Sequence, residues 1–247
     1  MLVVLQRDHV MMFCFVCCFL VFSYGVYNFA LHPDLGQWKN QGLVISSVDT
    51  AEKAVAFTFD DGPNPEATPQ VLEILRQNRA RATFFVLGLY AERYPALIKE
   101  IQAHGHEIGS HGYSHRIKEY NNSDFARSDV KRAQDILTEQ TGIRPRLLRP
   151  PGGFLSRDLV KYCQEESLSI ITWTWQADYK DWKATDPNLL ARQIIAGIQP
   201  GQIILLHDGG QNRKVMIDAL SRALPELSRR GYRCVTVSEL LALRKNK

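Results

Sequence analysis

The chain of 247 residues has little net charge and no internal repeat. Its formal net charge is +4, and its Lys and Arg residues alternate with acids instead of forming basic stripes with aromatic residues between them. Nucleic-acid binding depends on such stripes, so we expect no nucleic-acid partner. A hydrophobic content of 45% in a chain of this length predicts one sizeable folded core and excludes a fibre or a disordered chain.

Cysteine is also scarce outside one apolar run. Cys14, Cys17 and Cys18 lie within that run, where cysteine behaves as a small hydrophobic residue. Cys163 and Cys234 each lie within an apolar-patterned element. We predict that these two are buried free thiols, although an oxidising compartment would permit them to pair.

No Asp, Glu, Lys or Arg lies between Val10 and Leu31. As a helix, this segment would be about 33 Å long, enough to cross a hydrocarbon core of about 30 Å. The triplet Ser23-Tyr24-Gly25 also suits a cleavable secretion signal. We therefore predict that residues 1–31 are a membrane anchor or a signal peptide, with the rest of the chain outside the cytoplasm, membrane-anchored or secreted.

Residues 32–51 lack periodicity and predict a linker or an edge segment. Beyond them, short apolar runs alternate with amphipathic stretches, which predicts a parallel α/β sheet covered by helices, and about seven such units favour a barrel over residues 52–247. The predicted strands are 54–59, 81–87, 106–109, 146–148, 169–175, 202–206 and 233–237. The predicted helices are 69–78, 95–104, 123–140, 157–166, 188–198, 215–230 and a last one from Ser238.

Polar motifs follow several of these strands, and the carboxyl ends of parallel strands converge on one face of such a sheet. The motifs are Asp60-Asp61-Gly62-Pro63, His111-Gly112-Tyr113-Ser114-His115, Arg149-Pro150-Pro151-Gly152-Gly153, Asp178-Tyr179-Lys180-Asp181-Trp182 and Leu205-Leu206-His207. We therefore expect residues far apart in the sequence to meet at one site.

Two of these motifs suggest a metal. The adjacent carboxylates of Asp60 and Asp61 are costly to keep together unless a cation uses them, so one fits a metal ligand and the other a base. His111 and His115 have a spacing at which two imidazoles can bind one ion. Together they predict metal-assisted hydrolysis.

Taken alone, each motif also has a structural interpretation. Asp, Gly and Pro are common turn residues, and paired histidines are often surface or capping groups. His207 ends a buried strand, as a hydrogen-bonded core histidine would. The backbone N–H groups after Arg149 suit an oxyanion or merely a turn. The segment from Asp178 to Trp182 is also typical of a solvated loop with one packed Trp.

In order and approximate spacing, the five motifs together resemble those of the polysaccharide deacetylase family, also called the nodulation-type (NodB homology) domain. The resemblance covers roughly Ala54 to Leu241. It implies a distorted (β/α)7 barrel that removes N-acetyl groups from cell-wall polysaccharide containing GlcNAc or MurNAc, or from chitooligosaccharide. It also implies one divalent ion, usually Zn²⁺, with Co²⁺, Ni²⁺ and Mn²⁺ as alternatives. We expect a monomer acting on an acetylated amino-sugar polymer.

By motif position, the resemblance implies that the metal ligands are Asp61, His111 and His115. It implies that Asp60 is the general base and that His207 is the general acid. This division suits amide hydrolysis, which needs an activated water, a sink for the oxyanion and a proton for the leaving amine. A histidine close to a carboxylate is readily kept cationic for the last task.

The resemblance also implies supporting roles. Arg149 would tether the base, and Asp181 would orient the general acid. Gly152 stands where the family often has Tyr, so the backbone N–H for the oxyanion is kept and the aromatic wall is lost. Trp182 and Leu205 match the expected substrate-contacting positions.

Three alternatives stay open. Two histidines and one carboxylate also bind Fe(II) in oxygenases, although the adjacent Asp pair and the separate His207 argue against that class. A non-catalytic glycan-binding relative is disfavoured because Asp60 and His207 are both present. An O-acetyl esterase acting on xylan would use the same machinery.

Overall fold

The structure is a computed structural model that divides into two compact units, residues 1–42 and residues 43–247. The residues that it describes are 12, 15–19, 34–210 and 213–245.

In the first unit, residues 15–19 are helical and α2 spans Leu35–Asn40. Most of the predicted anchor or signal, residues 1–31, lies outside the described residues, so this assignment stays a prediction. Within the described part of the chain, no helix combines the length and the apolar character that crossing a membrane would require.

The second unit is built on a parallel sheet. Seven strands follow the order β1-β6-β5-β4-β3-β2-β7, and β8 pairs with β2 beside this path. All of these strand pairs are parallel. The strands are β1 (Val44–Ile45), β2 (Ala54–Asp60), β3 (Ala82–Val86), β4 (Glu107–Ser110), β5 (Leu147–Leu148), β6 (Ser169–Ile171), β7 (Ile203–His207) and β8 (Arg233–Cys234).

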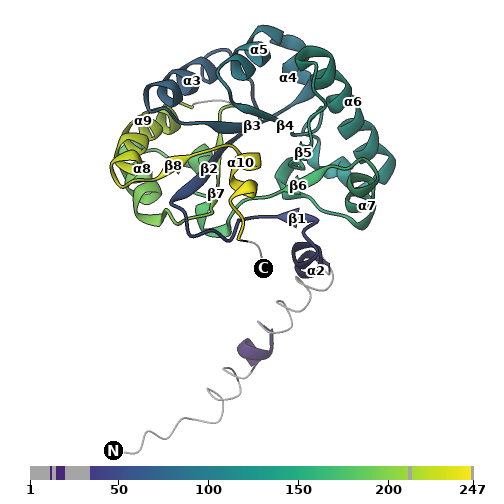
Figure 1. Cartoon of the computed structure of the whole chain (residues 1–247). Coiled ribbons are helices and arrows are strands. Elements are labelled where there is room, and N and C mark those ends of the chain that lie inside the picture. Colours follow the sequence, from purple (N-terminus) through teal and green to yellow (C-terminus); the bar gives the residue numbers. More distant parts are fainter. Residues whose placement is uncertain (1–11, 13–14, 20–33, 211–212, 246–247) are drawn as a thin grey trace, which may run out of the picture. The chain divides into compact units, whose positions relative to one another are not determined.

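Helices connect the strands and surround them, as Figure 1 shows for α3 to α9. The α-helices of this unit are α3 (Thr68–Gln77), α4 (Gly88–Arg93), α5 (Pro95–Ala103), α6 (Ser123–Thr141), α7 (Arg157–Glu165), α8 (Pro187–Gly197), α9 (Lys214–Arg229) and α10 (Val237–Ala242). The short 3₁₀ helices are η2 (Ile117–Asn121), η3 (Pro151–Gly153), η4 (Trp175–Ala177) and η5 (Asp181–Lys183).

Alternate residues of strand β2, which pairs with β3, β7 and β8, face two different cores, as the period of a strand requires. Val55, Phe57 and Phe59 are fully buried in a cluster with apolar residues of the surrounding helices α3, α5, α8 and α9. Ala54 and Ala56 belong to a second cluster, which includes residues of α10. The remaining inward positions of β2 are polar, and they begin the functional site.

The sheet curves back toward its own starting edge. Isolated bridges join Ser47 to Gln202 and Asp178 to Leu205, which links β7 to the segments that follow β1 and β6. The result is a parallel half-barrel covered by helices, consistent with the predicted distorted (β/α)7 barrel.

Two predicted strands extend well past the observed ends. The run 169–175 forms a strand only to Ile171 and then turns into η4. The run 233–237 stops at Cys234 because Thr236 caps α10 and forms a capping box with Glu239. Cys163 and Cys234 are unpaired, as predicted, and burial raises the pKa of both thiols to about 12.

Candidate metal centre and active site

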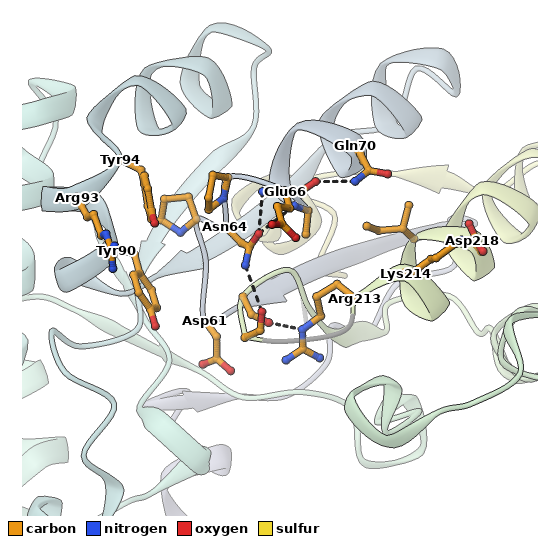
Figure 2. Close-up of a pocket in the computed structure, with 16 residues that line it drawn as sticks. Asp61, Asn64, Glu66, Gln70, Tyr90, Arg93, Tyr94, Arg213, Lys214 and Asp218 are labelled. Carbon is orange, nitrogen blue, oxygen red and sulfur yellow. Dashed lines mark hydrogen bonds between the residues drawn. The ribbon is translucent and has the colours of Figure 1, made fainter.

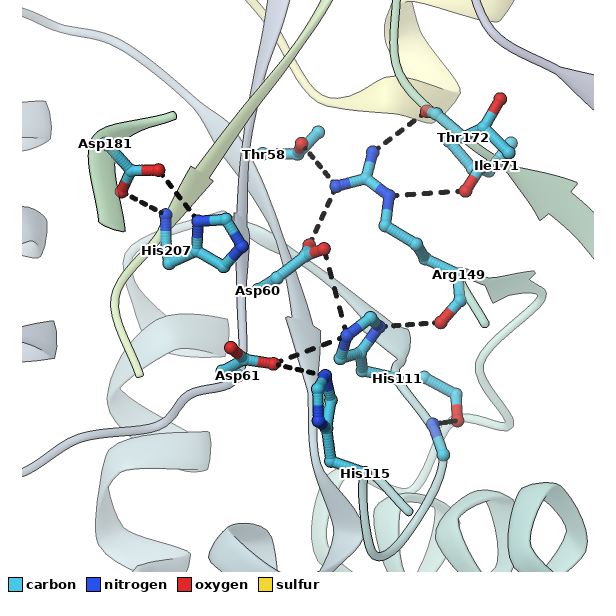
Figure 3. A network of polar contacts seen from close by, with 12 residues as sticks. Thr58, Asp60, Asp61, His111, His115, Arg149, Ile171, Thr172, Asp181 and His207 are labelled. Carbon is cyan, nitrogen blue, oxygen red and sulfur yellow. Dashed lines mark hydrogen bonds and ion pairs between the residues drawn. The ribbon is translucent and has the colours of Figure 1, made fainter. Parts of the chain in front are cut away.

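The residues singled out by the motifs lie at the carboxyl ends of neighbouring strands (Figure 3). Asp60 ends β2 and His207 ends β7, and the two residues are direct partners in the register of these strands. His111 follows β4, and Arg149 follows β5. The parallel register therefore gathers groups that are far apart in the sequence, as predicted.

Asp61, His111 and His115 form a cluster whose ligand atoms all lie within 4.8 Å of one another. Asp61 Oδ1 lies 3.4 Å from His111 Nε2 and 3.2 Å from His115 Nε2. This oxygen is buried without a hydrogen-bond partner. His111 Nδ1 lies 2.7 Å from the carbonyl oxygen of Arg149, which can only accept, so Nε2 keeps its lone pair. These converging lone pairs fit a divalent cation.

The protonation of these ligands also suits a cation. Burial would raise the pKa of Asp61, but the interaction with the nearby imidazoles of His111, His115 and His207 outweighs it and lowers the pKa. Burial lowers the pKa of His115, against the attraction of Asp61. An ionised carboxylate and a neutral imidazole are the forms in which these groups bind metals.

Left-handed backbone positions help to aim two of the ligands. The φ angles are 69° at Asp61 and 57° at His115. Such angles are uncommon for residues with side chains, although Asp and His tolerate them best. They cost of order 1 kcal/mol each and cluster at functional sites. At Gly209, an added Cβ would lie 1.9 Å from the carbonyl oxygen of Asp61, so this turn packs directly on neighbouring backbone.

A buried arginine holds Asp60. Arg149 Nη1 donates to Asp60 Oδ1 and to Thr58 Oγ1, both at 2.7 Å. Its Nε and Nη2 atoms donate to the carbonyl oxygens of Ile171 and Thr172 at 3.2 and 3.0 Å. Burial lowers the pKa of Arg149, and the charge of Asp60 opposes this shift. Arg149 occupies Oδ1 of Asp60, and Oδ2 faces His111, whose Nε2 lies 3.9 Å away.

His207 forms a pair with Asp181. Its Nδ1 lies 2.8 Å from Asp181 Oδ1, and its backbone N–H donates to Asp181 Oδ2 at 2.9 Å. Burial alone would lower the pKa of His207, but the hydrogen bond and charge of Asp181 and the charges of Asp60 and Asp61 raise it. The side chain is 16% exposed, so its ring can reach solvent.

The predicted substrate-contacting residues lie on three different segments. Gly152 lies in the η3 turn with a φ of 62°. Trp182 lies beside Asp181 in η5 and is 59% exposed. Leu205, on β7, is buried. Of the three, only Trp182 has a large exposed side chain, and Gly152 offers only backbone.

Two buried carboxylates near the site were missed from the sequence. Asp208 is fully buried and accepts a hydrogen bond from Thr68 Oγ1 at 2.5 Å, and burial raises its pKa to about 7. Asp129, on α6, accepts hydrogen bonds from the turn between the two histidine ligands. Asp208 directly follows the predicted site residue His207, and this position could have indicated that it lies near the site. Asp129 lies in an ordinary amphipathic helix, and nothing in the sequence indicates its contact with the turn.

A groove of about 720 Å³ begins at Asp61 (Figure 2). One wall carries Tyr90, Arg93 and Tyr94, and the two tyrosine rings are stacked with centroids 6.5 Å apart. Arg213 lies on the other wall. Aromatic faces with a few polar groups are typical of concave ligand sites.

Comparison with known proteins agrees with this geometry. The family model for polysaccharide deacetylases matches residues 47–170. Curated relatives include deacetylases of peptidoglycan N-acetylglucosamine, of peptidoglycan N-acetylmuramic acid and of chitooligosaccharides. One of them, a peptidoglycan-N-acetylglucosamine deacetylase of Bacillus cereus, is 40% identical over 200 residues, which make up 81% of this chain and 93% of that protein.

Solved structures extend the similarity to the fold. A crystal structure of a peptidoglycan N-acetylglucosamine deacetylase in complex with 4-naphthalen-1-yl-N-oxidanyl-benzamide matches with a TM-score of 0.80 and 32% identity, covering 87% of this chain and 100% of that chain. A CE4 family pseudoenzyme from Bacillus anthracis matches with a TM-score of 0.75 and 26% identity, covering 83% and 71%. On the strength of the matched family model and these relatives, the chain is a member of the polysaccharide deacetylase family of enzymes.

Proposed function

We propose that the chain is a metal-dependent hydrolase that removes N-acetyl groups from cell-wall polysaccharide containing GlcNAc or MurNAc, or from chitooligosaccharide. The observation that carries the proposal is the convergence of Asp61, His111 and His115, with the arginine-bound carboxylate of Asp60 next to them. The relatives named as peptidoglycan deacetylases support the substrate class.

Asp61, His111 and His115 are the residues that would hold the ion. Two imidazoles and one carboxylate favour Zn²⁺, with Co²⁺, Ni²⁺ and Mn²⁺ as alternatives. When bound, the cation supplies a Lewis acid for the acetyl carbonyl and for the attacking water.

Two protein groups move the protons. Asp60 accepts the proton of the attacking water through Oδ2, since Arg149 occupies Oδ1, and Oδ2 lies 3.9 Å from His111 Nε2. His207 donates a proton from Nε2 to the leaving nitrogen, because its Nδ1 is engaged by Asp181. The raised pKa of His207 favours the protonated ring that this role needs.

The remaining parts of the proposal concern the substrate and the location. The backbone N–H of Gly152 would bind the oxyanion, and Trp182 would stack on a sugar ring. Leu205 would pack against the acetyl group. The groove at Asp61 would take neighbouring sugar residues of the polymer. Residues 1–31 would serve as an anchor or a secretion signal. Of the predicted linker, residues 32–51, only the part before β1 would be a linker, because β1 pairs with β6 in the sheet of the second unit. The catalytic domain, predicted as residues 52–247, would then include β1 and act outside the cytoplasm as a monomer.

Membership of the polysaccharide deacetylase family argues against an Fe(II) oxygenase. The other two alternatives, an O-acetyl esterase and a non-catalytic glycan-binding protein, are both compatible with that family. An O-acetyl esterase acting on xylan would need the same residues. The pseudoenzyme among the similar structures shows that the fold can exist without the activity. Against a non-catalytic role, Asp60 and His207 are both held by buried partners, Arg149 and Asp181.

The test is acetate release by the full chain from peptidoglycan, N-acetylated chitooligosaccharide and acetylxylan, each with and without a chelator. We expect release from peptidoglycan, loss after chelation and recovery when Zn²⁺ is added. Activity that survives chelation contradicts the metal-dependent mechanism. Release from acetylxylan alone would identify the esterase, and no release from any of the three would identify the non-catalytic relative.

A further inference from the structure

The turn between the two histidine ligands is held on one side by the start of α4. The backbone N–H groups of Gly88 and Leu89 donate to the carbonyl oxygens of Gly112 and Tyr113 at 3.0 and 3.1 Å. These N–H groups belong to the first turn of α4, so they have no partner within the helix. The contacts satisfy the carbonyl groups of the turn.

A single buried carboxylate holds the other side of the turn. Asp129, on α6, is 6% exposed. Its Oδ2 accepts from the backbone N–H of Tyr113 at 2.8 Å, and its Oδ1 accepts from the hydroxyl of Ser114 at 2.6 Å. The N–H of Ser114 also lies 3.5 Å from Oδ2. Because burying a carboxylate is costly, packing alone would be served better by an apolar residue.

Tyr120 supplies another donor to the same carboxylate. Its side chain is completely buried, and its hydroxyl donates to Asp129 Oδ2 at 2.7 Å. Burial raises the pKa of Tyr120, so the hydroxyl keeps its proton. Gly112 makes room for this contact. A Cβ there would lie 2.2 Å from the Tyr120 oxygen and 2.7 Å from Asp129 Oδ2, and the φ of 77° independently favours glycine.

The second histidine depends on this turn more than the first. His111 is oriented by the carbonyl oxygen of Arg149 at its Nδ1. For His115, the hydrogen bonds of the described residues include no such partner at either ring nitrogen, and its side chain is 34% exposed. Its position relative to Asp61 is therefore set by the backbone of the turn that precedes it.

We propose that Asp129 and Tyr120 are positioning residues for the metal centre, holding the turn so that His115 meets Asp61 and His111 at one ion. The inference rests on the proposed function, because it presupposes a bound cation. Groups that orient metal ligands from outside the coordination sphere are typically worth about 10–100-fold in metal affinity. We expect a loss in that range for Asp129→Asn and a smaller loss for Tyr120→Phe, which removes one of the donors.

The experiment measures Zn²⁺ affinity of the full chain by competition with a chromophoric chelator. The visible absorption spectrum of the Co²⁺-loaded protein gives a second readout, because it reports ligand geometry independently of activity. Asp135→Asn, at an exposed site on α6, and Tyr162→Phe, at a buried tyrosine on α7, are the matched controls. We expect weaker binding and an altered spectrum in Asp129→Asn and Tyr120→Phe, and wild-type behaviour in both controls.

A double variant tests whether the two residues act as one unit. Both act through the same carboxylate, so the losses in Asp129→Asn and Tyr120→Phe should not add when the substitutions are combined. Wild-type affinity and spectrum in both single variants would overturn this inference and leave the proposed function intact. A wild-type chain that binds no divalent ion would overturn both. If Asp129→Asn fails to fold, Tyr120→Phe decides the question, since it removes only a hydroxyl.

Discussion

His106 and His111 flank the same strand, β4, and differ in what surrounds their rings. His106, at the amino end, packs edge-on against Phe84 with ring centroids 5.5 Å apart, and its Nδ1 accepts the backbone N–H of Ala82 at 3.2 Å. Burial lowers the pKa of His106 to about 4, so its ring is neutral. His111, at the carboxyl end, faces the carboxylate of Asp61. One residue type thus serves packing at one end and a candidate metal site at the other, and the groups around each ring make the difference.

The same contrast holds for the interior of the half-barrel. Toward the amino ends of the strands, it is filled by Ala54, Ile203, Val237 and Leu240. Toward the carboxyl ends, the interior is polar. It holds the buried ion pair of Arg149 and Asp60 and the contact between His207 and Asp181. Substitutions at the two ends should therefore separate stability from activity.

The largest effect is expected from Asp60→Asn at the polar end. An amide of nearly the same shape cannot accept the water proton, so kcat/KM for acetate release should fall by about 10²–10⁴-fold. Asp135→Asn, at an exposed carboxylate on α6, is the control and should retain full activity. A loss of less than about tenfold in Asp60→Asn would refute its role as the general base.

At the apolar end, Leu240→Ala should produce the opposite result. Leu240 is fully buried in the second apolar cluster, the one that contains Ala54 and Ala56. Its truncation should therefore lower the free energy of unfolding by about 2–5 kcal/mol. Urea unfolding measures this loss, and acetate release from the folded variant should match wild type. Leu189→Ala, at an exposed position, controls for the substitution itself. Activity that falls along with stability would remove the contrast between the two ends.

His106→Asn should change how stability depends on pH. The folded ring takes up a proton only near pH 4, whereas the unfolded ring does so near 6.5. The wild-type chain therefore loses stability as the pH falls through that window, by up to roughly 3 kcal/mol from this group. Asn keeps an acceptor for Ala82 and cannot be protonated, so the variant should lose less.

The measurement for this variant is urea unfolding at pH 7 and at pH 4.5. The exposed neighbour gives the control His104→Asn, which should keep most of the wild-type difference between the two pH values, because burial and not the charge of His104 is the main cause of the lowered pKa of His106. If His106→Asn keeps that difference as well, the buried neutral histidine is not its source.

The smallest effect concerns the pH profile of Asp181→Asn. His207 must be protonated to act as an acid, so activity is lost as the pH rises through its pKa. Asp181 raises that pKa. Its replacement should move the alkaline limb of kcat/KM to lower pH by about one unit or more. An alkaline limb that stays in place would show that another group donates the proton.

Much of the fold follows from local sequence patterns. The strand β2 and the helix α6 lie close to their predicted bounds, because a continuous apolar run and a long amphipathic period determine them. The helix α4 was missed because it is short and has no side-chain cap. The ends of β6 and β8 were also missed, since they depend on pairing and capping partners and not on hydrophobicity.

The site was predictable where its residues adjoin strand ends. Asp60, Asp61 and His207 occupy such ends, so parallel topology alone brings them together. Asp129 and Tyr120 could not be predicted in this way. The role proposed for them depends on the side-chain contacts of Asp129 with the turn and with Tyr120, and nothing in the pattern of α6 or η2 marks these contacts.

The division of labour between the neighbours Asp60 and Asp61 is the central claim, and metal content tests it most directly. Full chains carrying Asp60→Asn or Asp61→Asn are loaded with Zn²⁺, desalted and measured by elemental mass spectrometry. We predict about one equivalent of Zn²⁺ in Asp60→Asn, as in wild type, and a marked loss in Asp61→Asn. Equal retention in both variants, or loss in Asp60→Asn instead, would contradict the account.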